Sequence, residues 1–237
     1  MMHNVRTIAG RQFRSYFNGP IAYVVIGVML LVLGFLFWET FFLFGKATMR
    51  EMFRYASLIN YFALPALTMG LLAEEKRTGT IELLITMPVT DAQVIWGKFL
   101  GVLGLYLVML GLTIPYCFSV ASLGNLDWGP VFAGYFGMFL QGSAILGIGL
   151  MMSSFTDNQI VAFFGTLACS VAFFLVDKFL PFMPAGAANF FEALSFDAHF
   201  ESMRRGVLAF RDVLFFATVS VLTLMVAYRS LESRRWS

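Results

Sequence analysis

Residues 71–101 read LLAEEKRTGTIELLITMPVTDAQVIWGKFLG and place a charged break between two long apolar runs. The charges of residues 74–77 sum to zero, and Thr78-Gly79-Thr80 follows them. Apolar residues at 81, 84 and 85 share one face at helical spacing, and Met87-Pro88 ends that face. This order predicts a span, a charged elbow, a short amphipathic helix and a second span. The short helix could carry force from a soluble partner, with its apolar face in the partner's groove or on lipid.

The composition is that of a membrane protein. Of the 237 residues, 59% are hydrophobic and only 13% are charged, and the apolar residues form long blocks that exclude charge. The net charge of +2 is too small to indicate a nucleic-acid partner. Cys117 and Cys169 lie in apolar runs, which favours small core residues over a disulfide or a metal site.

Six apolar segments predict an all-α polytopic membrane protein whose single domain covers residues 1–237. The expected spans are near residues 21–38, 55–73, 94–123, 131–152, 160–176 and 213–228. An even number of spans puts both termini on one side, and arginines near both termini indicate that this side is cytosolic. The segment 74–91 is then a cytosolic coupling segment, and 177–212 is an external loop.

Residues 1–19 predict an interfacial helix before the first span. Its apolar face consists of Val5, Ile8, Ala9, Phe13 and Tyr16, and its polar face of Thr7, Arg11 and Arg14. A helix with a basic polar face is typical of a segment that lies on the anionic inner leaflet.

Two capping boxes mark expected helix starts: Thr90 with Gln93, and Thr156 with Gln159. Lys98 is near enough to a span end to extend its ammonium toward water.

Small residues one turn apart are compatible with a compact bundle or with a dimer face. The pairs are Gly97 and Gly101, Ala133 and Gly137, and Ser143 and Gly147.

Polar groups inside the spans are few. Asn60, Gln141 and Ser170 are expected to form hydrogen bonds between helices rather than to bind substrate. Pro65 and Pro115 interrupt two spans, either as hinges or as a result of packing. In the last external loop, Glu201 and Asp212 are expected to pair with neighbouring arginines on a solvated face, and Asp212 could also cap the sixth span.

The motifs of common enzymes are missing from the sequence. It contains no G-x-x-x-x-G-K-[ST], no H-E-x-x-H and no G-x-S-x-G. A nucleotide site, a metal site, a serine hydrolase and an intramembrane protease are therefore poorly supported. If this protein moves a substrate, the energy is expected to come from another chain.

The run EEKRTGTIELLITMPVTDAQVIWGKFLG resembles the region between the second and third spans of ABC-2-type transporter permeases. The residues that carry this resemblance are Glu74, Glu75, Gly79, Thr80, Glu82, Leu83, Leu84, Pro88, Gly97 and Lys98. Three further stretches are similar to the gliding-motility-associated branch, the Gld-type F subunit. They are FRSYFNGPIAYVVI at 13–26, TDNQIVAF at 156–163 and AHFESMRRGVLAFRDVLFF at 198–216.

The resemblance implies a type V exporter-like permease in the bacterial cytoplasmic membrane. Its expected partners are a soluble ABC ATP-binding subunit, which holds ATP and Mg²⁺, and a second permease, identical or different. A membrane-anchored auxiliary subunit with a large external domain is a further expected partner. The coupling surface is expected at Glu74, Glu75, Gly79, Thr80, Glu82, Leu83, Leu84 and Pro88. The alternative is a force-transmitting anchor of an envelope complex that transports no substrate.

Overall fold

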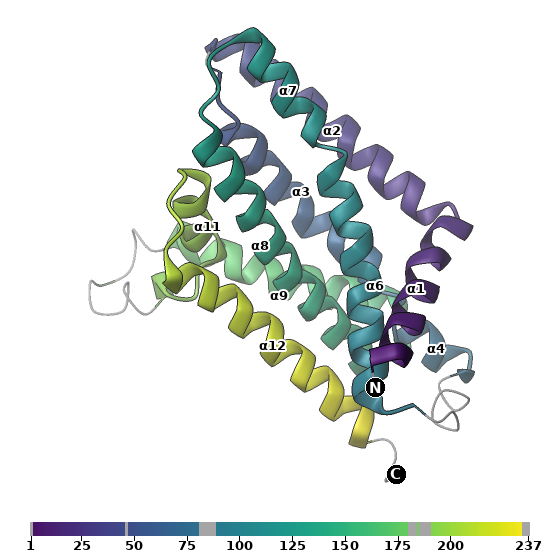
Figure 1. Ribbon diagram of the computed structural model, residues 1–237. Helices are drawn as coiled ribbons and strands as arrows, with labels where there is room; N and C mark the ends of the chain where they lie inside the picture. Colours follow the sequence, from purple (N-terminus) through teal and green to yellow (C-terminus); the bar gives the residue numbers. More distant parts are fainter. Residues whose placement is uncertain (1, 46, 81–88, 180–183, 185–190, 234–237) are drawn as a thin grey trace.

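The computed structural model describes residues 2–45, 47–80, 89–179, 184 and 191–233. Every secondary-structure element within these ranges is a helix (Figure 1). The helices are α1 (Met2–Asn18), α2 (Ile21–Phe44), α3 (Arg50–Thr68), α4 (Ala73–Arg77), α6 (Asp91–Gly111), α7 (Ile114–Leu123), α8 (Trp128–Phe155), α9 (Gln159–Phe179), α11 (Phe196–Arg204) and α12 (Phe210–Ser233).

Six helical segments among the described residues are long and apolar enough to cross a membrane. They are α2, α3 with α4, α6 with α7, α8, α9 and α12. This confirms the all-α polytopic fold. The first helix, predicted near residues 21–38, extends to Phe44 and ends at Gly45. The Thr40 hydroxyl bonds the carbonyl oxygen of Leu36 at 2.9 Å, and α2 continues until Gly45 adopts a φ of 60°.

Both chain termini lie at the same end of the bundle, together with α1 and α4 (Figure 1). We call this the termini end. The connections from α2 to α3 and from α7 to α8 lie at the opposite end. An even number of spans puts both ends of the chain on one side, so this arrangement agrees with six spans.

The core of the bundle is built around α8, which packs against α3, α6, α9, α11 and α12. Hydrogen bonds between side chains connect it to its neighbours. Gln141 Nε2 donates to the Tyr61 hydroxyl at 2.9 Å, and Asn60 Nδ2 donates to the Tyr106 hydroxyl at 2.7 Å. Tyr106 in turn donates to the carbonyl oxygen of Met138 at 3.0 Å. Gln141 and Asn60 therefore have the interhelical role that the sequence predicts.

Ser170 does not follow the same prediction. Its side chain is fully buried, yet Oγ has no hydrogen-bond partner among the described residues. The two prolines also differ. Pro65 stays inside α3, whereas the third span breaks between Gly111 and Ile114, one residue before Pro115. Residues 94–123 are therefore two helices.

The amphipathic helix α1 packs on α6 instead of only on lipid. Ile8 and Tyr16 are buried, and the Tyr16 hydroxyl donates to the carbonyl oxygen of Leu67 at 2.6 Å. Burial raises the pKa of Tyr16, so the hydroxyl stays protonated as a donor. The close approach of α1 to α6 depends on Gly97 of α6, because a Cβ at this position would lie 2.6 Å from Ile8 Cγ2 of α1.

The other small-residue pairs also serve this chain's own packing. A Cβ on Gly137 would meet Met203 of α11, and one on Gly147 would meet Thr223 of α12. These contacts give no evidence for a dimer face along the small residues.

Two charges near α11 pair differently from each other. Glu201 pairs with Arg204 and Arg205, as predicted. Asp212 has the predicted arginine neighbour, since Arg211 Nε lies 3.6 Å from its Oδ1, but it does not lie on a solvated face and does not cap α12. It is fully buried in the first turn of α12, and its Oδ1 lies 2.7 Å from His199 Nδ1. The predicted cap and the predicted solvated position are wrong because α12 begins at Phe210, so Asp212 is already inside the helix.

Candidate functional site

The charged elbow of the sequence is the short helix α4 at the termini end. It follows α3, which ends at Thr68. Glu74 and Glu75 occupy its first turn, and Lys76 and Arg77 its last, which is the order that the helix dipole favours. Gly79 then adopts a φ of 69°, a backbone conformation that L side chains rarely adopt.

The start of α4 is bonded to α8 through a side chain that sequence reasoning missed. Ser153 is fully buried near the end of α8. Its Oγ accepts from the backbone N–H of Leu72 at 3.0 Å and of Ala73 at 2.9 Å, and it donates to the carbonyl oxygen of Met69 at 3.1 Å. One serine thus satisfies two N–H groups that the first turn of a helix leaves without an intrahelical partner.

The neighbouring residue Ser154 extends this junction to α12. Its carbonyl oxygen accepts from Lys76 Nζ and, at 2.9 Å, from Ser230 Oγ of α12. The only sequence signal for this junction is a pair of serines at the end of an apolar run.

Lys98 connects α4 to α6. The sequence predicted that its ammonium extends to water, but Lys98 is only 2% exposed. Its Nζ lies 2.7 Å from Glu75 Oε1 and donates to the carbonyl oxygen of Leu71 at 2.5 Å. The ammonium turns inward because both acceptors lie beside α6. Glu75 Oε2 is buried and has no hydrogen-bond partner among the described residues.

A polar cavity of about 520 Å³ lies between α1, α4 and α6. Glu74 and Thr80 line it from the elbow, Arg11 and Ser15 from α1, and Lys98 from α6. The cavity brings the basic face of α1 next to the acidic start of α4.

The predicted coupling residues fall into three groups. Glu74, Gly79 and Thr80 are exposed at the termini end. Glu75 is half-buried and ion-paired, so it is not a free surface charge. The remaining four lie outside the described residues, namely Glu82, Leu83, Leu84 and Pro88.

The capping box at Thr90 is present at the start of α6. Thr90 Oγ1 accepts from the Gln93 N–H at 3.3 Å, and Gln93 Oε1 accepts from the Thr90 N–H at 3.2 Å. Asn4 Nδ2 of α1 also donates to Gln93 Oε1, at 3.4 Å.

The second predicted box, Thr156 with Gln159, is wrong. Thr156 ends α8, and its Oγ1 accepts from the Asn158 N–H at 3.1 Å. Asn158 Oδ1 accepts from the Ile160 N–H at 2.9 Å and so takes the capping position. The reason is that α9 begins at Gln159, which leaves Thr156 too far from the first helical turn.

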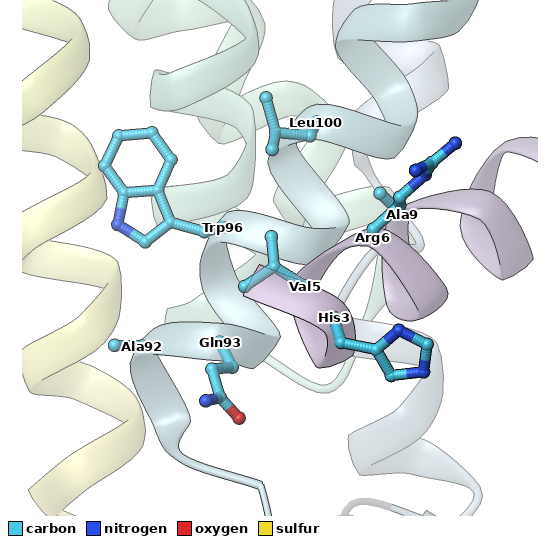
Figure 2. A pocket seen from close by; sticks show the side chains of 8 residues that line it. All are labelled: His3, Val5, Arg6, Ala9, Ala92, Gln93, Trp96 and Leu100. Atoms are coloured by element: carbon cyan, nitrogen blue, oxygen red, sulfur yellow. The ribbon is translucent and has the colours of Figure 1, made fainter. Parts of the chain in front are cut away.

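A second feature of the termini end is an apolar groove between α1 and α6, larger than the polar cavity (Figure 2). It opens beside Trp96, whose side chain is directed away from α1 (Figure 2).

A comparison with curated proteins found no match. A comparison with protein families agrees with this architecture. Residues 55–225 match the family described as ABC-2 family transporter protein. The match covers the elbow and five of the six spans, from α3 into α12. The match makes the chain a transport component that crosses the membrane several times. The family implies that such a component has an ATP-binding subunit as its partner. The chain belongs to the ABC-2 family of transporter membrane proteins.

Proposed function

We propose that this chain is the permease subunit of an ATP-driven, exporter-type ABC transporter, and that residues 74–91 contact a separate ATP-binding subunit. The observation that supports this most is the bonding of α4. Ser153 joins α4 to α8, and the Glu75–Lys98 ion pair joins it to α6. A push on this five-residue helix is therefore passed to two spans at once.

ATP and Mg²⁺ belong to the partner in this proposal, because the sequence has no phosphate-binding loop of its own. Closure of the ATP-binding subunits would displace α4. Lys98 lies eight residues beyond Thr90, about 12 Å along α6 at the usual rise per residue. Because the helix breaks after Gly111, α6 can tilt while α7 keeps its position.

The proposal places the termini end in the cytosol and the chain in the bacterial cytoplasmic membrane. The arginines near both termini support this orientation. The full complex would contain a second permease. In a gliding-type system it would also contain an auxiliary subunit with a large external domain. The stretches at 156–163 and 198–216 support that branch by resemblance only.

The test uses the tagged full-length chain purified with its ATP-binding subunit in mild detergent. Glu74→Lys and Leu84→Arg should weaken recovery of the ATPase, because both change the proposed contact surface. Glu75→Gln should keep the ATPase bound and lower its stimulation, because Glu75 pairs inside the permease. Arg229→Gln, an exposed change at the same end, is the matched control. Recovery of no ATPase, or equal behaviour of all four variants, would overturn the assignment.

A force-transmitting anchor that transports no substrate is the second candidate. The hydrogen bonds of Gln141 and Asn60 favour it, because they hold α3, α6 and α8 together as one block. The two candidates differ in whether water reaches mid-bundle during turnover. In a chain without its native cysteines, Ser57→Cys should react with a charged thiol reagent under ATP turnover if substrate passes. No reaction during turnover would support the anchor.

A further inference from the structure

Among the described residues, the three arginines of α1 have no acidic partner, whereas most of the other described arginines do. Arg6, Arg11 and Arg14 are exposed, and α1 contains no acidic residue. None of the three forms a salt bridge with another described residue. In contrast, an acidic side chain lies within 4.0 Å of Arg54, Arg204, Arg205, Arg211 and Arg229. Arg11 lines the cavity with Glu74, so Arg6 and Arg14 are the charges of α1 that are available to an anion outside the chain.

One of these arginines lines an apolar groove of about 760 Å³ between α1 and α6. Val5 and Ala9 of α1 and Trp96 and Leu100 of α6 form its apolar wall. In Figure 2, Arg6 lies on α1 with Val5 between it and Trp96, and its guanidinium extends away from the indole. The groove thus combines an apolar wall with a guanidinium that pairs with no acidic side chain in the described part of the chain.

A second apolar groove, of about 220 Å³, lies between α6 and α12. Ile95, Leu224 and Met225 line it, and it shares Ala92 and Trp96 with the first groove. The two apolar grooves therefore have Ala92 and Trp96 of α6 in common. Of the described residues, no acidic one lines either groove.

The position of these grooves along the span matches the level of lipid headgroups. Trp96 lies six residues after the Thr90 cap, about 9 Å into α6. Tryptophan is enriched at the boundary between headgroups and acyl chains, and arginine readily extends toward the headgroups. The apolar walls then lie where acyl chains begin.

We propose that this surface binds one anionic diacyl phospholipid. Its phosphate would pair with the guanidinium of Arg6, a geometry that allows two parallel hydrogen bonds. One acyl chain would lie along Ala9 and Leu100, and the other in the groove against α12, with the Trp96 indole between them. A zwitterionic lipid is less favoured, because its amine would meet Arg6 and find no acidic side chain. This inference does not depend on ATP coupling.

The experiment uses the full-length chain in vesicles that contain phosphatidylglycerol and phosphatidylcholine analogues, each with a photoreactive acyl chain. Mass spectrometry of the labelled protein locates the adducts. We expect adducts of the phosphatidylglycerol analogue on α6 and α12 near Trp96, about fivefold above those of the phosphatidylcholine analogue. Arg6→Gln should abolish this preference. Arg14→Gln, an exposed arginine on the same helix that lines neither groove, should keep it.

A second variant tests the grooves without removing the charge. Ala92→Phe places a ring where the two grooves meet, so it should reduce labelling by both analogues while Arg6 remains. The proposal is overturned if both analogues label equally, or if Arg6→Gln and Arg14→Gln lose the preference equally, which would indicate diffuse attraction. It is also overturned if Trp96→Cys forms a disulfide between two copies, because a second permease would then occupy the surface.

Discussion

The ion pair between Lys98 and Glu75 is the contact whose removal should be most informative. Lys98 is 2% exposed, and among the described residues its ammonium bonds Glu75 and the carbonyl oxygen of Leu71. Removing one partner of a buried pair typically costs about 3–5 kcal/mol, because the other charge stays buried alone. Glu75→Gln should therefore lower the free energy of unfolding by about 3 kcal/mol, since one charged acceptor is lost and one carbonyl remains.

Substitution of the other partner, Lys98, should cost less. The Glu75 side chain is 22% exposed, so after Lys98→Met the carboxylate can turn toward water, and we expect a loss of about 2 kcal/mol. The double variant removes both charges and should also lose only about 2 kcal/mol, because no charge is left buried. The two effects are then non-additive, with a coupling energy of about 3 kcal/mol.

Equilibrium unfolding in mild-detergent micelles, followed by tryptophan fluorescence, measures the four free energies of this cycle. The exposed pair Arg54–Glu51 provides the control cycle. Its atoms are 3.5 Å apart and its side chains are 60% and 36% exposed, so its coupling energy should stay below about 1 kcal/mol. Additive losses at Lys98 and Glu75 would refute the reasoning, because they would mean that water separates the two charges.

Three further changes test other contacts by the same unfolding measurement. Ser153→Ala should cost about 1–3 kcal/mol, because two backbone N–H groups lose their acceptor, and amide exchange at these two residues should accelerate. Gly79→Ala should cost about 1 kcal/mol because of its φ of 69°, whereas Gly19→Ala, which has open space and no positive φ, should be close to neutral. His199→Leu should cost about 1–3 kcal/mol, because the buried Asp212 carboxyl loses its partner at 2.7 Å and keeps only Arg211 Nε at 3.6 Å, and Asp212→Asn in the same chain should restore part of that loss.

The features that sequence alone predicts correctly are those that depend on neighbouring residues. The spans follow from apolar blocks long enough to cross hydrocarbon, and α1 follows from one helical period. The capping box at Thr90 needs only residues three apart. At 156–158 three successive residues can cap a helix, and the choice of Asn158 depends on where α9 begins. Local pattern does not determine that start to within one residue.

The contacts that define the candidate site depend on tertiary structure. Lys98 is near a span end in the sequence, but α4 folds back beside α6 and supplies Glu75, so the ammonium is buried. Asp212 is similar, because α11 brings His199 against it. Ser153 carries no sequence signal beyond its place in an apolar run. Its role arises because the turn after α3 directs two N–H groups at α8.

The close approach of α1 to α6 gives a final prediction that involves both proposals, because α1 lines the polar cavity and the apolar groove. A Cβ on Gly101 would lie 2.7 Å from Gln12 Cβ and 3.0 Å from the backbone oxygen of Ala9. Because backbone cannot yield as a flexible side chain does, Gly101→Ala should push α1 away from α6, at a cost of about 1–3 kcal/mol.

Limited trypsin digestion in micelles measures this displacement, since α1 carries Arg6, Arg11 and Arg14. Gly101→Ala should be cleaved in α1 several-fold faster than the parent chain, because a detached helix opens more readily. Gly111→Ala is the matched control. It changes the same helix where a Cβ meets nothing within 4 Å, so its α1 should be cleaved at the parental rate. Equal cleavage of the two variants would show that α1 is held by contacts other than the glycine face of α6. The positions of the polar cavity and the apolar groove would then not depend on close packing of α1 against α6.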